Sequence, residues 1–346
     1  MKKLVHLILV FIFFYTYSNT VNSFEIRQKN LIKPYCKGEI GFDSTNIYTQ
    51  SKKPKKIEVV FNNQRKYYKN FIRLIKTLGN YPETKIISKT FKKFEYAEVY
   101  AHYENNIICK FKAKARITGS KGTHVSKTDL ISSLSIKLED GNILHKNKFL
   151  LLIPRARFNE NEIFIASLFQ EINFLSPITF YVETEINGTK AGKFIFQEKI
   201  SLSTISHNKR GKGIILAANK RSQFKSVIDG YNKDSPLQLN LGMAVESGNY
   251  SSEIITNAID KINYLILQKY DQRHLYHHHT KMILNNNNLH IKKSHIYELI
   301  MIAAGAAHGI TREDRRFFYD FLNDSLEPIY FDGKSLIFEK SFVLDE

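Results

Sequence analysis

The chain has 346 residues, 43% of them hydrophobic, and a formal net charge of +18 at pH 7. This length and apolar content exclude a disordered chain and allow one large domain or two. The positive charge suits an anionic partner, but a general bias toward Lys, Asn and Ile explains it better. Because aromatic residues are not interleaved with the basic ones and no nucleic-acid motif occurs, we expect no specific nucleic-acid partner.

The N-terminal residues have the order of a secretory signal peptide. Lys2 and Lys3 precede an uncharged apolar run over residues 4–17, and small polar residues follow at 18–23. About fourteen apolar residues are short for a membrane span of ~20. We therefore expect an exported protein, in the periplasm, cell envelope or extracellular space; membrane attachment would require that the segment stays uncleaved. The two cysteines, Cys36 and Cys109, would then permit one disulfide.

The spacing of apolar residues predicts strands first and helices later. The expected strands of the first part are 56–61, 94–100, 107–117, 133–138, 149–153, 179–186 and 193–196, with helices at 67–78 and 159–172. After a basic loop at 209–212 and a polar stretch to about 252, we expect helices at 254–270, 273–284 and 294–307 and a hairpin of strands 315–319 and 327–331. This order predicts an α+β protein.

The segment from Gly305 to Gly333 carries the most informative polar residues. A helical apolar run ends at a Gly-containing turn with His308, and Asp314 follows just before the first hairpin strand. Asp332 follows the second strand. Because antiparallel strands start and finish at one end of a hairpin, we predict that Asp314 and Asp332 lie close together. Two carboxylates near a histidine suit a divalent cation and a phosphate, and a solvated hairpin end is the alternative interpretation.

Three residues upstream are candidate nucleotide-binding groups. Lys137 lies on the polar face of the strand 133–138, where a lysine could bind phosphates, although an exposed-face lysine is the favoured interpretation. Glu198 ends an apolar strand, and a solvated strand end is an equal alternative. Arg116 precedes a Gly-containing loop that lacks both G-x-G-x-x-G and the Walker A pattern, so this loop is weak evidence for phosphate binding.

Several blocks of sequence, taken in order, resemble the CotH family of spore-coat kinases. The similarity covers about residues 96–333, and the order and type of the blocks carry it more than any single motif. The blocks are KAR at 114–116, SLSIKL at 133–138, FLLLIP at 149–154, NEI at 161–163, SPIT at 176–179, NG at 187–188, GKFIFQEKI at 192–200, RRFFYD at 315–320 and EPIYFDG at 327–333.

The resemblance implies an atypical protein-kinase-like fold with a strand-rich N-terminal lobe and a helical C-terminal lobe that ends in a metal-site hairpin. On this basis, residues 1–23 are a signal peptide, 24–95 an N-terminal extension and 96–346 a CotH kinase-like domain. The passage between the lobes is expected at about 199–252.

The resemblance also implies an activity: transfer of the γ-phosphoryl group of ATP to Ser or Thr of a secreted, coat or envelope protein, with Mg²⁺ or Mn²⁺. Lys137 would correspond to the nucleotide-contacting lysine, Glu198 to the glutamate of the "QEK" motif and Asp332 to the metal-binding aspartate. The hairpin geometry adds Asp314 as a second metal ligand, and the Gly-containing loop adds Arg116 as a candidate nucleotide-binding residue.

The chain departs from the family at the catalytic position. The family's catalytic aspartate is expected shortly before the hairpin, where this chain offers His308 or Asp314. A histidine can act as a base near neutral pH. The alternative is a CotH-like chain that is catalytically weak or inactive and serves as a scaffold or assembly protein of the cell envelope.

Overall fold

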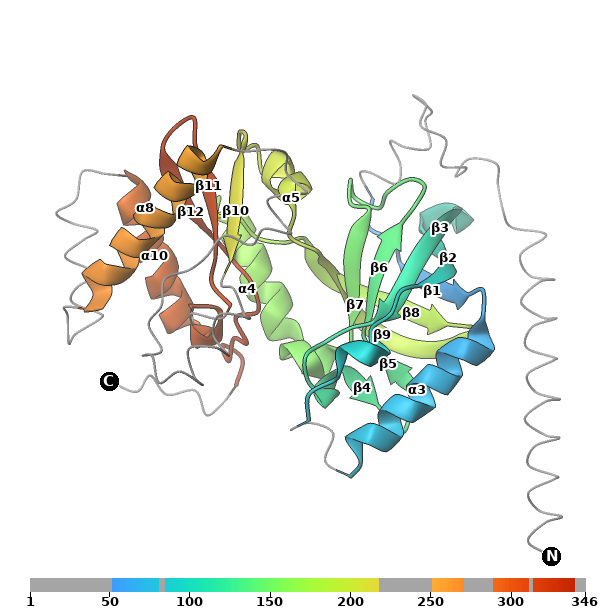
Figure 1. The fold of residues 1–346 in the computed structure, drawn as a ribbon. Helices are drawn as coiled ribbons and strands as arrows, with labels where there is room; N and C mark the ends of the chain where they lie inside the picture. Colours follow the sequence, from blue (N-terminus) through green and yellow to red (C-terminus); the bar gives the residue numbers. More distant parts are fainter. Residues whose placement is uncertain (1–51, 81–84, 218–250, 271–288, 311–313, 340–346) are drawn as a thin grey trace, which may run out of the picture. The chain divides into compact units, whose positions relative to one another are not determined.

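A computed structural model describes residues 52–80, 85–217, 251–270, 289–310 and 314–339 (Figure 1). The chain divides into two compact units, one of residues 1–153 and 181–196 and one of residues 154–180 and 197–346. The predicted signal peptide, the predicted helix 273–284 and most of the predicted passage between lobes lie outside the described residues. Within the described residues, no helix is both long and apolar enough to span a membrane.

The first unit is built around a closed barrel of seven strands, in the order β1-β2-β3-β6-β7-β9-β8. β1 pairs antiparallel with β2 and parallel with β8, and this second pairing closes the barrel. The strands are β1 Lys56–Phe61, β2 Glu95–His102, β3 Ile108–Ile117, β6 Leu134–Leu138, β7 Lys148–Leu152, β8 Thr179–Ile186 and β9 Thr189–Glu198, with a separate pair of β4 Val125–Ser126 and β5 Ile131–Ser132.

Local sequence explains most of these elements. β3 alternates between buried and accessible side chains, as a strand with one face toward a core does. Asn187 and Gly188, in the turn between β8 and β9, have φ values of 51° and 78°, which Asn and Gly adopt most readily. Helix α3, Gln64–Leu78, begins where the Asn63 side chain accepts a hydrogen bond from the Lys66 N–H.

The second unit contains a three-stranded antiparallel sheet, in the order β10-β11-β12, with helices packed against it (Figure 1). Its strands are β10 Gly213–Ala217, β11 Arg316–Asp320 and β12 Ser325–Ile329, and its helices are α4 Glu160–Glu171, α5 Leu202–His207, α8 Ser252–Tyr270 and α10 Leu289–Ala303, with a 3-10 turn η7 at Ala307–Ile310. Side chains from both faces of the sheet are buried: Ile214 packs with Ala258 of α8, and Ile215 packs with Ile205 of α5. Strands that are buried on both faces read as continuous apolar runs.

A third cluster of buried side chains joins α4, α10 and the segment after β12. Phe169, Tyr297, Met301 and Tyr330 belong to it, and the rings of Phe169 and Tyr330 lie 5.3 Å apart. This cluster holds residues 304–310 and 330–333 in place, and these two segments carry His308 and Asp332.

The predicted kinase-like fold of two lobes, with a helical second lobe, is wrong. The structure is centred on a closed barrel, and the second unit has a sheet of its own besides its helices. Two pairings that local patterns do not reveal explain the error. Lys56 of β1 pairs with Glu183 of β8, far along the chain. β10 pairs with β11 although we expected a polar, Gly-containing stretch there. Residues 56–78, assigned to an N-terminal extension, supply a barrel strand and α3.

Candidate functional site

The hairpin of β11 and β12 brings the ends of two chain segments together. Arg316 pairs with Ile329 at one end of the hairpin, and Asp320 pairs with Ser325 at the turn. Asp314 stands shortly before β11 and Asp332 shortly after β12, at the end opposite the turn. The prediction that these two carboxylates lie close together is confirmed.

His308 reaches the same place from a different element. It belongs to η7, the 3-10 turn that follows α10. The next residue, Gly309, allows the turn to pack closely: a Cβ there would lie 2.5 Å from Met301 Cε and 2.8 Å from the Phe331 carbonyl oxygen. Any side chain at 309 would therefore push η7 away from the backbone that leads into Asp332.

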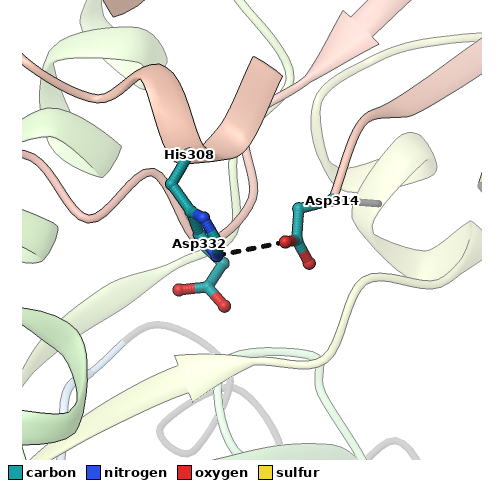
Figure 2. Close-up of side chains that lie close together, drawn as sticks. All are labelled: His308, Asp314 and Asp332. Atoms are coloured by element: carbon teal, nitrogen blue, oxygen red, sulfur yellow. Dashed lines mark ion pairs between the residues drawn. The ribbon is translucent and has the colours of Figure 1, made fainter. Parts of the chain in front are cut away.

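His308, Asp314 and Asp332 form a compact cluster of potential metal ligands (Figure 2). One ligand atom from each residue lies within 4.8 Å of the others, and His308 Nε2 is 3.1 Å from Asp314 Oδ2. Asp314 is buried, and the other two are partly accessible. Imidazole nitrogen and carboxylate oxygen at this spacing fit a first-row divalent cation such as Mn²⁺, whereas Mg²⁺ prefers oxygen ligands alone. The cluster is the part of the predicted site that the structure brings together.

Asp332 is held in an uncommon backbone conformation. Its φ is 47°, in the left-handed region that residues other than Gly, Asn and Asp rarely adopt. The following Gly333 packs so closely that an added Cβ would lie 2.8 Å from the Tyr330 ring. The surrounding packing therefore fixes the direction of the Asp332 side chain, which a ligand group needs.

A buried arginine that the sequence reading missed, Arg157, forms an ion pair with Asp332. Burial alone would raise the pKa of Asp332, but the Arg157 guanidinium outweighs it, with help from His308 and Lys334, so the pKa lies below its ordinary value. Burial lowers the pKa of His308, and the charge of Asp314 opposes this only in part. At neutral pH the cluster therefore holds an ionised Asp332 beside a neutral imidazole.

Glu162, a buried carboxyl group near Arg157 and Asp332, was also missed as a functional residue. It is fully buried on α4, where Gln197 Nε2 and the Tyr330 hydroxyl each donate a hydrogen bond of 2.7 Å to its carboxyl group. Burial raises the pKa of Glu162, against the opposing charge of Arg157. The sequence does indicate that Glu162 is buried, because its spacing places it on the same helix face as Ile165 and Phe169.

Arg316, the first residue of β11, is the second guanidinium near the cluster. Its Cζ lies 3.7 Å from the centre of the Phe331 ring, and its buried Nε donates no hydrogen bond within the described residues. Burial lowers the pKa of Arg316 to about 10, although Asp314 and Asp332 favour its charged form. The side chain thus remains charged at neutral pH, with no ion pair to any carboxylate in the described part of the chain.

Glu198, predicted to bind nucleotide, is a buried part of the framework. Its carboxylate accepts hydrogen bonds from Thr204 Oγ1 at 2.6 Å and from the Ile178 N–H at 3.2 Å. It therefore ties the end of β9 to α5 and to the residue before β8, and it is not part of the His308–Asp314–Asp332 cluster. A solvated strand end, the alternative from sequence, is excluded because Glu198 is 2% exposed.

Lys137 and Arg116 lie on the barrel, in the first unit, so the cluster of the second unit forms without them. Lys137 is exposed on β6, opposite Lys114 of β3. Arg116 stacks on Phe94, with 4.6 Å between Cζ and the ring centre, and donates to the Lys92 carbonyl. Both positions are accessible to an anion, and their nucleotide-binding role stays a prediction.

Comparison with models of protein families and with curated proteins finds no match for this chain. The resemblance to the CotH family therefore stays a prediction.

Proposed function

We propose that this protein is an exported, divalent-metal-dependent phosphotransferase, which transfers the γ-phosphoryl group of ATP to a Ser or Thr hydroxyl of a secreted, coat or envelope protein. The observation that carries the proposal is the cluster of His308, Asp314 and Asp332. The sequence resemblance supplies the nucleotide and the class of acceptor. Phosphoryl transfer does not require the kinase-like fold, because the same chemistry recurs on unrelated folds.

The two carboxylates are the groups that would hold the cation. Asp314 precedes β11 and Asp332 follows β12, so both lie at the same end of the hairpin, and the close packing of Gly333 against Tyr330 fixes the backbone at Asp332. A divalent cation, when bound there, neutralises charge on the nucleotide phosphates. Two carboxylates suit a cation that shares its remaining positions with phosphate oxygens.

His308 is the candidate base for the acceptor hydroxyl. Its Nε2 faces Asp314 Oδ2 at 3.1 Å, and a carboxylate in that position orients an imidazole and stabilises the imidazolium that forms. Because burial lowers the pKa of His308, the ring is neutral at neutral pH and can accept a proton. As a third metal ligand, the same ring would favour Mn²⁺ over Mg²⁺. The metal preference therefore distinguishes the two roles.

Two features support export. The N-terminal residues have signal-peptide order. Cys109 is disulfide-bonded, and the only other cysteine of the chain, Cys36, lies outside the described residues. Disulfides persist in oxidising compartments outside the cytoplasm.

The test is phosphate transfer by the purified protein. The chain is incubated with labelled ATP, Mn²⁺ or Mg²⁺ and co-secreted proteins, and acid-stable label on Ser or Thr is the expected product. Asp332→Asn should abolish the label, whereas the control Asp324→Asn should leave it unchanged, since Asp324 is an exposed carboxylate at the turn, paired with Lys261. Absence of transfer by the wild type, or equal transfer by Asp332→Asn, would refute the proposal.

The ion pair between Arg157 and Asp332 favours a second candidate, a non-catalytic scaffold of the cell envelope. In that case Arg157 would satisfy Asp332 permanently and no cation would bind. The scaffold predicts no change in melting temperature with ATP and Mn²⁺, together with recovery of a protein partner in pull-downs. A metal-dependent rise in melting temperature would exclude it.

A further inference from the structure

Two guanidiniums meet at one aromatic ring beside the metal-ligand cluster. The Cζ atoms of Arg157 and Arg316 lie 5.4 Å and 3.7 Å from the centre of the Phe331 ring, and Phe331 directly precedes Asp332. The Nε atoms of both arginines are buried and donate no hydrogen bond within the described residues. Buried donors are normally paired, so two such donors at one place indicate a partner that is still to bind.

The charges around the cluster point to the sign of that partner. Lys334 acts on His308 and Asp332 along with the two arginines. In the structure as it stands, Asp314 and Asp332 offset these positive charges. A divalent cation bound to the same two carboxylates would neutralise their negative charge, so they would no longer offset the positive charges of the basic side chains. The site would then carry a positive excess, and an anion would have to balance it.

The geometry of the donors selects the class of anion. A guanidinium presents a planar fork of N–H donors that matches two oxygens of a phosphate, and it is weakly hydrated enough to act in a buried place. Both guanidiniums make a cation–π contact with the Phe331 ring, which keeps them next to Asp332. A phosphoryl group has enough oxygens to accept from both arginines and to contact the cation at the same time.

We propose that Arg157 and Arg316 form a phosphoryl-binding subsite, and that Arg157 moves from Asp332 to the phosphate when a divalent cation takes Asp332. The inference rests on the proposed function for the identity of the cation site. It assigns the Arg157–Asp332 ion pair to the metal-free state, in which the guanidinium occupies the place of the cation charge. Cation and phosphate then favour each other's binding, and the coupling is reciprocal.

This exchange predicts opposite effects of one substitution on two ligands. Arg157→Met removes the competitor for Asp332, so Mn²⁺ alone should bind several-fold more tightly. The same change removes a charged fork from the phosphate, so pyrophosphate should bind about tenfold or more weakly in the presence of Mn²⁺. Arg316→Met should also weaken pyrophosphate binding by about tenfold, since Arg316 holds no carboxylate that its loss would free.

The experiment is calorimetric titration of the full chain with Mn²⁺ alone, with pyrophosphate in chelator, and with pyrophosphate after saturation with Mn²⁺. The variants are Arg157→Met, Arg157→Lys, Arg316→Met and Arg316→Lys. Arg155→Met is the matched control, because Arg155 is an exposed arginine two residues from Arg157. The lysine variants keep the charge but lose the fork, which guards against variants that fail to fold. They should weaken pyrophosphate binding by several-fold, while Arg155→Met matches the wild type.

The proposal is overturned if pyrophosphate binds equally to the wild type and to the Arg316 variants. It is overturned equally if Arg157→Met weakens Mn²⁺ binding instead of strengthening it, because Arg157 would then only stabilise the fold. Failure of the proposed phosphotransferase function can be distinguished from failure of the phosphoryl-binding subsite. Pyrophosphate bound through both arginines without any ATP turnover refutes phosphotransfer and leaves the subsite, whereas undiminished turnover in the arginine variants refutes the subsite alone.

Discussion

Replacing Gly309 by alanine tests whether close packing positions His308. The added methyl group would lie 2.5 Å from Met301 Cε and 2.8 Å from the Phe331 carbonyl oxygen. The methionine end can move, but the carbonyl belongs to the backbone that carries Asp332. The turn η7 must therefore shift, and His308 must shift with it. Overpacking of this kind lowers the free energy of unfolding by about 1–3 kcal/mol.

The effect on the cluster should exceed the effect on stability. His308 and Asp332 are placed by two backbones that meet at Gly309, and displaced supports of metal ligands typically weaken metal binding by about 10- to 100-fold. Gly211→Ala is the control, since a Cβ at 211 would lie 3.7 Å from Asp320 Oδ2, an ordinary contact. Urea denaturation and Mn²⁺ titration measure the two quantities. If Gly309→Ala matches Gly211→Ala in both, the argument that packing positions His308 fails.

Two buried hydrogen bonds and the titration of His308 provide further tests. Tyr330→Phe removes the donor to buried Glu162 Oε2, so the free energy of unfolding should fall by about 1–3 kcal/mol in urea denaturation; an unchanged value would show that this bond is not stabilising. Thr204→Val removes the donor to Glu198 Oε1, with a similar loss of stability but unchanged Mn²⁺ affinity; a lost Mn²⁺ site would link Glu198 to the cluster after all. Because the pKa of His308 is lowered, and a base acts when neutral, kcat/KM for phosphate transfer should rise with pH to a midpoint below 6.5 and then stay level. A midpoint above 6.5 would show that His308 is not the base.

The elements that sequence predicted correctly are those set by local patterns. Asn187-Gly188 specified the hairpin of β8 and β9, and two short strand-like runs indicated the hairpin of β11 and β12, which brings Asp314 near Asp332. Antiparallel geometry then placed the two carboxylates without any information on distant contacts. This part of the site was predictable because it depends on residues that are neighbours along the chain.

Closure of the barrel and strand β10 of the second unit could not be predicted from local patterns. Closure of the barrel depends on β1 pairing with β8, and no local pattern encodes a partner so far along the chain. β10 is a fully buried run of five residues directly after a basic loop, and such a run gives no alternation to identify a strand. The missed strand β10 explains the predicted helical lobe, and the missed pairing of β1 with β8 explains why the barrel was not predicted.

The burial of Arg157 and Glu162 was missed because residues of these types usually lie at the surface. Arginine and glutamate are rarely buried unless they are paired, so Arg157 after a strand and Glu162 in a helix read as surface residues. Their partners, Asp332 and Tyr330, lie at the far end of the sequence. Conversely, Glu198 was assigned to a ligand although its hydrogen bonds show it to be part of the framework.

The proposed phosphate transfer depends on a divalent cation held by Asp314 and Asp332 beside His308. Titration of the full chain with Mn²⁺, followed by electron paramagnetic resonance, measures this binding, because bound Mn²⁺ loses the signal of the free ion. The wild type and the control Asp324→Asn should each show one saturable site, and Asp332→Asn should bind at least about tenfold more weakly. If the wild type has no saturable site, or if Asp332→Asn binds Mn²⁺ as tightly as the wild type, the two carboxylates do not hold a cation.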